Sequence, residues 1–330
     1  MKSFRYAHPD SMDAAVHLLN VGGDRARPIA GGIDLLDEMK EYIISPETVV
    51  NLKTIPGLNR LEVRRDGLTI GPLVTLAEIA ADQRLQDRYA ALSGAALSVG
   101  TPQIQHVGTV GGNLCQRPRC WYYRDEDIIC LKKGGDRCYA VAGDNRYHAI
   151  FGGGPSYIVH PSDMAPALMA HGASVTIAGP KGRRTVPLDE FFVLPAQNVL
   201  RENILTPGEI VASIHVPAPP PGARSVYIKQ RGRESFDWAL ASAAVLLHLE
   251  RGQVSHAAVV MGGVAPKPWR AVAAEKALVG KHWSPDLAAA AAAAAVKDAE
   301  PMPDNGYKVP LARETVRLAL LEAAGETNVQ

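Results

Sequence analysis

Two pairs of adjacent glycines, at residues 31–32 and 111–112, constrain the fold of this chain more than any other feature. The first pair lies in Ile29–Leu36 and the second in Gly108–Asn113. Glycine lets backbone amides approach a ligand that a Cβ atom would hold away, which suits a pyrophosphate. Two such loops indicate a dinucleotide, although each pair taken singly fits an ordinary turn equally well. Neither loop has the G-x-G-x-x-G spacing, so the sequence disfavours a Rossmann fold.

Length and charge exclude several classes of protein. The 330 residues, 47% of them hydrophobic, allow a large core and two or three domains. A formal net charge of +1 gives no excess of positive charge to hold a nucleic acid, so we expect none as a partner. No apolar run reaches the roughly 18 residues of a membrane span. Residues Met1–Asp10 lack the pattern of a secretory signal, so we expect a cytoplasmic protein unless a partner subunit carries it elsewhere.

The first part of the chain mixes helix and strand signals. A helix is predicted to begin near Ser11, and a strand at Glu47–Leu52. Two strand-like segments flank Asp66-Gly67, a dipeptide suited to the positive φ angles of a hairpin turn. Thr75 and Glu78 have the spacing of a capping box, which predicts a helix directly after Thr75.

A proline-rich segment, His215–Gly222, divides the chain. Its prolines fix φ and cannot donate to a sheet, so we predict a stiff connector and a boundary between domains 1–220 and 221–330. Ser284 and Pro285 are typical of a helix start. Beyond the boundary we predict three antiparallel strands at 225–230, 239–249 and 254–261, followed by helices that include 288–295 and 311–324.

All four cysteines fall in one stretch without a regular pattern. Between Cys115 and Ser156, charged residues, glycines and aromatic residues mix with no period of 2 or 3.6, over more residues than ordinary loops use. A loop of this length needs an internal organiser. Because disulfides would usually be scattered along a chain of this size, the clustering favours metal ligation. The cysteines are Cys115, Cys120, Cys130 and Cys138.

The order of several motifs makes the chain resemble a known family, the FAD-binding subunit or domain of the xanthine dehydrogenase family of molybdenum hydroxylases. The resemblance covers nearly the whole chain, and several ordered motifs are far more specific than one. The motifs are Ala30–Leu36, Ile70–Ile79, Gly108–Leu114 and His160–Asp163, with Tyr227–Lys229, Arg231, Asp237 and Tyr307–Lys308 matching the C-terminal domain of the family.

The resemblance implies an α+β fold in which FAD lies between two subdomains of the PCMH type, followed by a C-terminal α+β domain with a three-stranded antiparallel sheet and helices. Asp163 is similar to an acidic residue that contacts the adenosine part of FAD, although an acid there also suits a helix N-terminus. Lys229 matches a lysine near the flavin, where positive charge would stabilise the reduced ring. The implied cofactor-binding residues are Ile29, Ala30, Gly31, Gly32, Ile33, Asp34, Leu35, Thr109, Gly111, Gly112, Asn113, Ser162, Asp163 and Lys229.

The cysteine-rich stretch, at about 115–156, resembles an insertion in the flavoprotein subunits of 4-hydroxybenzoyl-CoA reductase and of periplasmic-type aldehyde oxidoreductases. Those subunits carry a [4Fe-4S] cluster there, and four thiolates complete such a cluster. We therefore predict all four cysteines as ligands. Those relatives take their fourth ligand where this chain has Ser156. Cys115 or a non-cysteine ligand replaces it here, or the cluster is incomplete or absent; zinc and unligated thiols are the other interpretations.

Other polar and aromatic residues in and around this stretch are more simply explained by structural roles. His106, His148 and His160 suit metal ligation or acid–base chemistry, but scattered loop histidines are more often structural. The aromatic run Trp121–Tyr123 is expected to pack the loop against the domain rather than to stack on a cofactor.

The resemblance implies an electron-transfer function. A molybdopterin-binding large subunit would oxidise an aldehyde or N-heterocycle, and a small subunit with [2Fe-2S] clusters would pass the electrons to FAD on this chain, which delivers them to an external acceptor. No catalytic residue is expected here. Two alternatives stay open: a free-standing FAD-dependent oxidase or reductase, and a cluster-bearing assembly module without flavin turnover.

Overall fold

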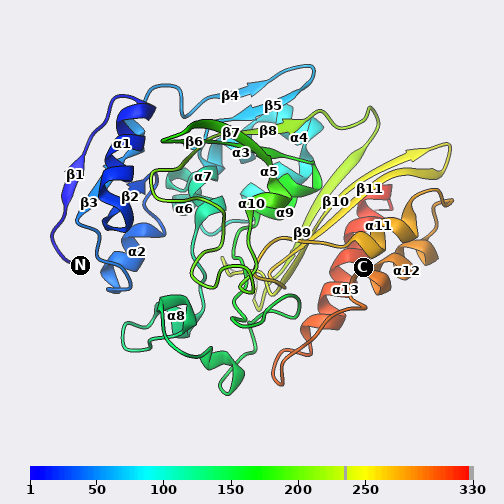
Figure 1. The fold of residues 1–330 in the computed structure, drawn as a ribbon. Coiled ribbons are helices and arrows are strands. Elements are labelled where there is room, and N and C mark those ends of the chain that lie inside the picture. The colour runs from blue at the N-terminus through cyan, green and yellow to red at the C-terminus, as the bar shows by residue number, and fades with distance from the viewer. Residues whose placement is uncertain (234–235, 327–330) are drawn as a thin grey trace.

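Three β-sheets organise the part of the chain that the structure describes, with helices packed between and beside them. The computed structural model describes residues 1–233 and 236–326. Figure 1 shows the sheets following one another from the blue N-terminal layer to the yellow and red C-terminal layer. A long irregular segment, coloured green and containing the short helix α8 (Trp121–Arg124), extends away from the sheets.

The N-terminal layer is a parallel sheet of order β1-β3-β2. Its first helix is confirmed where Ser11 predicts it, because the serine hydroxyl accepts a hydrogen bond from the Ala14 amide at 3.3 Å. The strand predicted at 47–52 is the fully buried central strand. The elements are β1 (Arg5–Ala7), α1 (Met12–Gly22), β2 (Ala26–Ile29), α2 (Leu35–Lys40) and β3 (Thr48–Asn51).

The middle layer is an antiparallel sheet of order β4-β5-β8-β6-β7, whose apolar face packs on helices in the largest core. The capping box is confirmed: Thr75 Oγ1 accepts from the Glu78 amide, and the Glu78 carboxylate accepts from the Thr75 amide at 2.7 Å. The elements are β4 (Leu61–Val63), β5 (Gly67–Ile70), α3 (Leu76–Ala81), α4 (Gln83–Arg88), α5 (Ala90–Leu97), α6 (Pro102–Val107), α7 (Val110–Cys115), α9 (Met164–Ala170), β6 (Ser174–Gly179), β7 (Gly182–Pro187), α10 (Leu188–Phe191) and β8 (Ile210–Pro217).

The predicted β4–β5 hairpin forms, but its turn differs from the prediction. Neither Asp66 nor Gly67 has a positive φ, and Gly67 already belongs to β5. A Cβ atom on Gly67 would lie 2.5 Å from the Val216 carbonyl oxygen. The glycine is therefore needed for the close approach of β8 rather than for the turn.

The proline-rich connector is shorter than predicted. Strand β8 continues through Pro217, and His215 pairs with Thr69 on one side and Ser174 on the other. Pro217 ends the strand, where its missing N–H interrupts no further ladder bond. The irregular connector is thus limited to residues 218–223.

The C-terminal layer has the three predicted strands and, as a correction, a fourth strand of two residues at its edge, giving the order β12-β11-β10-β9. The turn between β10 and β11 uses Arg251 and Gly252, both with positive φ. Side chains of β10 alternate, so that Ala244 and Leu246 enter the middle core while Val245 and Leu247 face the C-terminal helices. The strands are β9 (Arg224–Gln230), β10 (Ala241–Glu250), β11 (Gln253–Gly262) and β12 (Trp269–Arg270).

Three helices cover the outer face of this sheet. The alanine-rich helix follows its predicted cap, as the Ser284 hydroxyl accepts from the Leu287 amide at 3.1 Å, and it buries an i, i+3, i+4, i+7 stripe of alanines. The last helix begins at Lys308 rather than at the predicted Leu311. No helix in the described part of the chain is long and apolar enough to cross a membrane. The helices are α11 (Val272–Leu278), α12 (Pro285–Ala295) and α13 (Lys308–Ala324).

Candidate functional site

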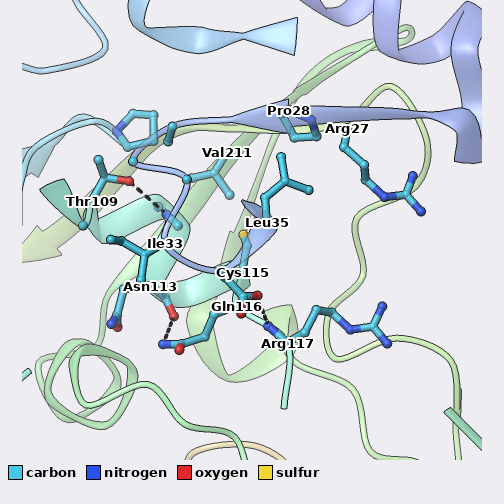
Figure 2. Close-up of a pocket in the computed structure, with 18 of the residues that line it drawn as sticks. Arg27, Pro28, Ile33, Leu35, Thr109, Asn113, Cys115, Gln116, Arg117 and Val211 are labelled. Carbon is cyan, nitrogen blue, oxygen red and sulfur yellow. Dashed lines mark hydrogen bonds between the residues drawn. The ribbon is translucent and has the colours of Figure 1, made fainter. Parts of the chain in front are cut away.

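The two glycine loops converge on one cavity of about 690 Å³, within the range of small-molecule sites. A Cβ atom on Gly31 would lie 2.1 Å from the Val107 carbonyl oxygen and 3.3 Å from Gly108 Cα, so the loops are in direct backbone contact. Figure 2 shows Ile33 and Leu35 of the first loop in the same pocket as Thr109 and Asn113 of the second. The glycine pairs therefore meet in space, as a dinucleotide site requires.

The first loop has a run of free donors, whereas most amides of the second loop are already used. In the second loop, the amides of Gly111, Gly112 and Asn113 donate to Pro72 O, Thr109 Oγ1 and Thr109 O. This loop is the start of helix α7, and Thr109 is its N-cap. The first loop leads into α2, and among the described residues five consecutive amides find no acceptor, those of Gly31, Gly32, Ile33, Asp34 and Leu35. Five free amides beside a cavity can hold an anion such as a pyrophosphate.

Two of the predicted site residues lie outside the cavity wall. Ile29 is buried in a small core with Met39 and Val49. Ser162 is buried behind Asn113, and its hydroxyl donates to Asn113 Oδ1 at 2.5 Å and accepts from the Ala165 amide. Both residues support the loops from behind rather than facing the cavity. The remaining predicted cofactor-binding residues line it.

Asp163 and Lys229 form one buried ion pair that faces the cavity. Lys229 Nζ donates to the Asp163 carboxylate at 2.7 Å, the Tyr227 hydroxyl donates to its other oxygen at 2.6 Å, and both charged side chains are 3% exposed. Burial raises the pKa of Asp163, while Lys229 and Tyr227 oppose that rise. The two were predicted to contact different parts of FAD, whereas the structure places them together.

An ionic latch ties the first glycine loop to the cysteine-rich insertion. The Asp34 carboxylate, predicted to contact the cofactor, accepts from the Arg117 amide at 2.7 Å and from the Arg124 guanidinium at 2.6 Å, and Arg119 lies 3.0 Å away. The Tyr123 hydroxyl donates to the buried Glu38 carboxylate at 2.5 Å. The start of the insertion is therefore fixed to the wall of the cavity.

A second buried network lies behind the latch. The Glu202 carboxylate, whose side chain is 3% exposed, forms ion pairs with Arg117 Nε at 2.7 Å and with Lys132 Nζ at 2.5 Å. Burial lowers the pKa of Lys132 and Glu202 raises it again. Lys132 belongs to the segment between Cys130 and Cys138, so this network fixes a second part of the insertion.

Sequence analysis missed several residues of the cavity wall. Arg27, Arg117 and Arg119 bring positive charge, and Phe236 and Trp238 bring exposed aromatic surface from the C-terminal domain. The Arg119 guanidinium lies 4.9 Å from the centre of the Trp238 ring, in cation–π geometry. No local sequence signal marks these residues, because they reach the cavity only through tertiary contacts.

The cysteines fall into two places. Cys115 ends α7 and lines the cavity, and burial alone raises the pKa of its thiol to about 12. Cys120, Cys130 and Cys138 lie in the insertion; burial raises the pKa of Cys120 to about 11, and Cys138 and Cys130 add to that rise. Among the described residues, no three His, Cys, Asp or Glu side chains are placed to hold a single metal ion.

His148 joins the second group. Its Nε2 atom lies 3.3 Å from Cys120 Sγ, its side chain is buried, and its Nδ1 atom has no partner among the described residues. Burial, with the charge of Lys308, lowers the pKa of His148 to about 4, so the imidazole is neutral near pH 7. The 28-residue separation of Cys120 and His148 matches no spacing rule, so the sequence gave no indication that the two side chains are in contact.

Comparison with known proteins agrees with this architecture. A family model described as "FAD binding domain in molybdopterin dehydrogenase" matches residues 2–219, and one described as "CO dehydrogenase flavoprotein C-terminal domain" matches residues 226–323. The chain is 36% identical to the aldehyde oxidoreductase FAD-binding subunit PaoB of Escherichia coli, over 99% of this chain and 100% of that one. It is 29% identical to the nicotine 6-hydroxylase medium subunit of Paenarthrobacter nicotinovorans, over 99% of each chain.

A solved structure also matches over nearly the full length. A chain of the carbon monoxide dehydrogenase from Hydrogenophaga pseudoflava superimposes with a TM-score of 0.79 and 30% identity, covering 98% of each chain. The medium chain of that organism's enzyme is likewise 30% identical to this chain, over 96% of each. Together with the cavity shared by both glycine loops, these matches show that the chain belongs to the FAD-binding medium subunits of the xanthine dehydrogenase and CO dehydrogenase family.

Proposed function

We propose that this chain is the FAD-binding electron-transfer subunit of a molybdenum hydroxylase. The observation that carries the proposal is the single cavity formed where the two glycine loops touch, with five free amides on one side. When bound there, FAD supplies the ability to accept electrons singly or in pairs and to release them to an external acceptor.

The chain's own residues hold and orient the cofactor. The amides of residues 31–35 bind the pyrophosphate, and the Thr109 hydroxyl, which accepts from Gly112, keeps its proton free to donate. The Asp163–Lys229 pair closes one part of the wall as a unit of nearly balanced charge. No side chain of this subunit needs to contact the substrate of the complex.

The partners follow from the relatives. The medium chain of carbon monoxide dehydrogenase and the medium subunit of nicotine 6-hydroxylase belong to multi-subunit enzymes by name. We infer a molybdopterin-binding large subunit and a small subunit with [2Fe-2S] clusters for this chain as well. Because the relatives include an aldehyde oxidoreductase and a nicotine hydroxylase, an aldehyde or an N-heterocycle is the proposed substrate class. The cytoplasmic location and the domain division at residue 220 stay predictions.

The insertion is proposed to carry a [4Fe-4S] cluster. Cys120, Cys130 and Cys138 provide soft sulfur donors close enough to affect one another, and two ionic networks fix their region to the cavity wall. Zinc needs donors that converge on one ion, and the described residues contain no such group. A cluster spreads its ligands over several irons and so does not require that convergence.

Analysis of the natively purified assembly tests the proposal. We expect co-purifying subunits with molybdenum, one FAD per copy of this chain, and more iron than two [2Fe-2S] centres contain. A chain that purifies alone with FAD and oxidises a substrate by itself would support the free-standing oxidase instead. An assembly with cluster iron but without a flavin absorption band would support the assembly module.

A further inference from the structure

We propose that His148 supplies a protein ligand to the iron–sulfur cluster, through Nε2, and completes the set formed by Cys120, Cys130 and Cys138. This inference rests on the cluster in the proposed function and goes beyond it, because it assigns a nitrogen ligand where four thiolates were predicted. It takes Cys115 out of the ligand set.

The position of the imidazole carries the assignment. Its Nε2 atom lies 3.3 Å from Cys120 Sγ, so the two donors belong to one site. The residue is only 3% exposed, and its Nδ1 atom has no hydrogen-bond partner among the described residues. An unpartnered buried nitrogen is costly unless a ligand uses the ring. A neutral imidazole that binds iron through one nitrogen keeps its proton on the other.

The backbone brings Cys130 and Cys138 to each other. Residues 130–138 form a closed loop, in which the Leu131 amide donates to the Arg137 carbonyl at 2.9 Å and the Gly135 amide donates to the Cys130 carbonyl at 2.9 Å. Cys130 directly precedes Leu131 and Cys138 directly follows Arg137, so the hydrogen bond between Leu131 and Arg137 holds the two cysteines near each other. Gly135 permits this closure, because a Cβ atom there would overlap the Ile129 carbonyl oxygen.

Aromatic packing joins this loop to Cys120 and His148. The Tyr122 ring, two residues after Cys120, stacks on Tyr139 with 6.1 Å between ring centres, and Tyr139 directly follows Cys138. The same Tyr122 ring lies 6.1 Å from the His148 ring. The Tyr122 ring therefore lies between Tyr139, next to Cys138, and His148, which places the segments of these donors beside that of Cys120.

The other candidates for the fourth ligand are less suitable. Cys115 lines the flavin cavity and packs against the middle core, and only burial affects its thiol. Ser156 is buried, but a hydroxyl is a poor donor for iron and sulfide. The Ala149 amide donates to the Tyr157 carbonyl at 2.9 Å, so the segment of His148 lies beside that of Ser156. His148 can therefore serve the same side of the site.

The backbone of His148 is held by the C-terminal domain. Lys308 Nζ and Asn305 Nδ2 each donate to the His148 carbonyl oxygen at 3.1 Å, and Lys308 also donates to the Gly263 carbonyl. A ligand that is fixed in this way loses little freedom on binding.

Spectroscopy of the natively purified assembly tests the inference. In the wild type we expect a [4Fe-4S] signal on reduction, with strong hyperfine coupling from one nitrogen that changes when histidine is labelled with ¹⁵N. His148→Cys should keep the iron, lose the nitrogen coupling and lower the midpoint potential, because a thiolate adds negative charge. His148→Ala should lose at least half of the cluster iron while FAD content is retained.

Three matched variants complete the test. Cys115→Ser and Ser156→Ala should keep both iron and nitrogen coupling, and so should His160→Asn, which replaces another buried histidine with an unpartnered Nε2 atom. A wild-type cluster without nitrogen coupling, or loss of iron in Cys115→Ser alone, would overturn the ligand assignment and leave the proposed function intact. A wild-type assembly with FAD and no [4Fe-4S] signal would overturn the cluster itself.

Discussion

Individual residues decide whether the two glycine loops can form one cavity. Gly31 faces the carbonyl of Val107, and Gly111 faces Pro72, at distances that no Cβ atom tolerates. Gly112 is different, since a Cβ atom there would meet only the Thr109 hydroxyl, at 3.2 Å. The four loop glycines are therefore not equivalent.

Gly31→Ala should separate the loops. The added methyl group would overlap a backbone oxygen that cannot rotate away, so we expect a loss of about 3 kcal/mol of stability together with loss of FAD. Gly112→Ala, in the other loop, should lower both the stability and the FAD content less. Flavin absorbance per chain and thermal unfolding measure the two effects. Equal FAD content in both variants would contradict the proposed contact.

Removing one partner of the buried Asp163–Lys229 pair should be worse than removing both. Asp163→Asn leaves a buried ammonium group without its counter-ion, a change that typically costs about 3–5 kcal/mol. The double variant Asp163→Asn, Lys229→Met removes that charge and should recover part of the loss. Denaturant unfolding of the wild type, both single variants and the double variant measures the coupling. Additive single effects would show that the pair is not coupled.

His171 should make the protein sensitive to acid. Burial lowers its folded-state pKa to about 4, and neither ring nitrogen has a partner among the described residues. In the unfolded chain His171 binds a proton below about pH 6.5, whereas in the folded chain it does so only near pH 4. The free energy of unfolding is therefore highest above pH 6.5 and falls as the pH drops toward 4. By pH 5 the loss is about 2 kcal/mol.

His171→Phe should reduce this pH dependence by the part that belongs to His171, because burial also lowers the pKa of His148 and His160 to about 4. Denaturant unfolding between pH 7 and pH 5 measures it, with the exposed His256→Gln as the control. If both variants show the same slope as the wild type, His171 is not the group responsible.

At the scale of elements, the insertion is fixed by charge on one side and by the C-terminal domain on the other. Glu202 contacts Arg117 and Lys132, which lie on either side of Cys120 and Cys130. The segment around His148 is held by Asn305 and Lys308. An irregular stretch of this length becomes ordered because its charged groups are paired below the surface.

Glu202→Gln should loosen the insertion, because Glu202 lies at the cavity wall and pairs with residues from two parts of the insertion. Lys132, whose side chain is 1% exposed, would lose its counter-ion, so we expect faster tryptic cleavage within 117–137 and lower cluster iron. Asp136→Asn removes only an exposed ion pair with Arg137, keeps every tryptic site of that window, and should change neither quantity. Unchanged cleavage in Glu202→Gln would mean that the metal site alone orders the loop.

Local signals predicted most of the elements but not the site contacts. The caps at Ser11, Thr75 and Ser284 lie where the sequence places them, because a cap depends only on residues within one helical turn. The misplaced turn at Gly67 fails for the opposite reason: a residue of β8, far along the chain, decides the role of that glycine.

The same distinction applies to the site. Glycine pairs and clustered cysteines are visible in the sequence, and the structure brings the two glycine loops together. The pairing of Asp163 with Lys229 and of His148 with Cys120 joins residues that no spacing rule connects. Sequence reasoning therefore named the donors but not their partners.

At the scale of the whole molecule, the cavity draws on all three layers. Its wall includes the first glycine loop, the start of α7, the strand β8 and the aromatic residues Phe236 and Trp238 of the C-terminal domain. A ligand bound there contacts elements that otherwise belong to separate cores.

FAD should therefore stabilise the entire chain. A ligand at 100 times its dissociation constant adds about 2.7 kcal/mol, so removing FAD should lower the melting temperature and adding it back should restore it. AMP and FMN, which each present half of the cofactor, should restore less. A melting temperature that is independent of FAD would place the cofactor elsewhere.

The contacts between the C-terminal domain and the insertion also determine when the insertion can become fully ordered during synthesis. Asp304, whose amide donates to Asn145, is made 159 residues later, a delay of roughly 10–30 s at ordinary ribosomal speeds. Throughout that interval the nascent insertion lacks its final anchor. We therefore expect the proposed cluster to assemble on the completed polypeptide rather than on the growing one.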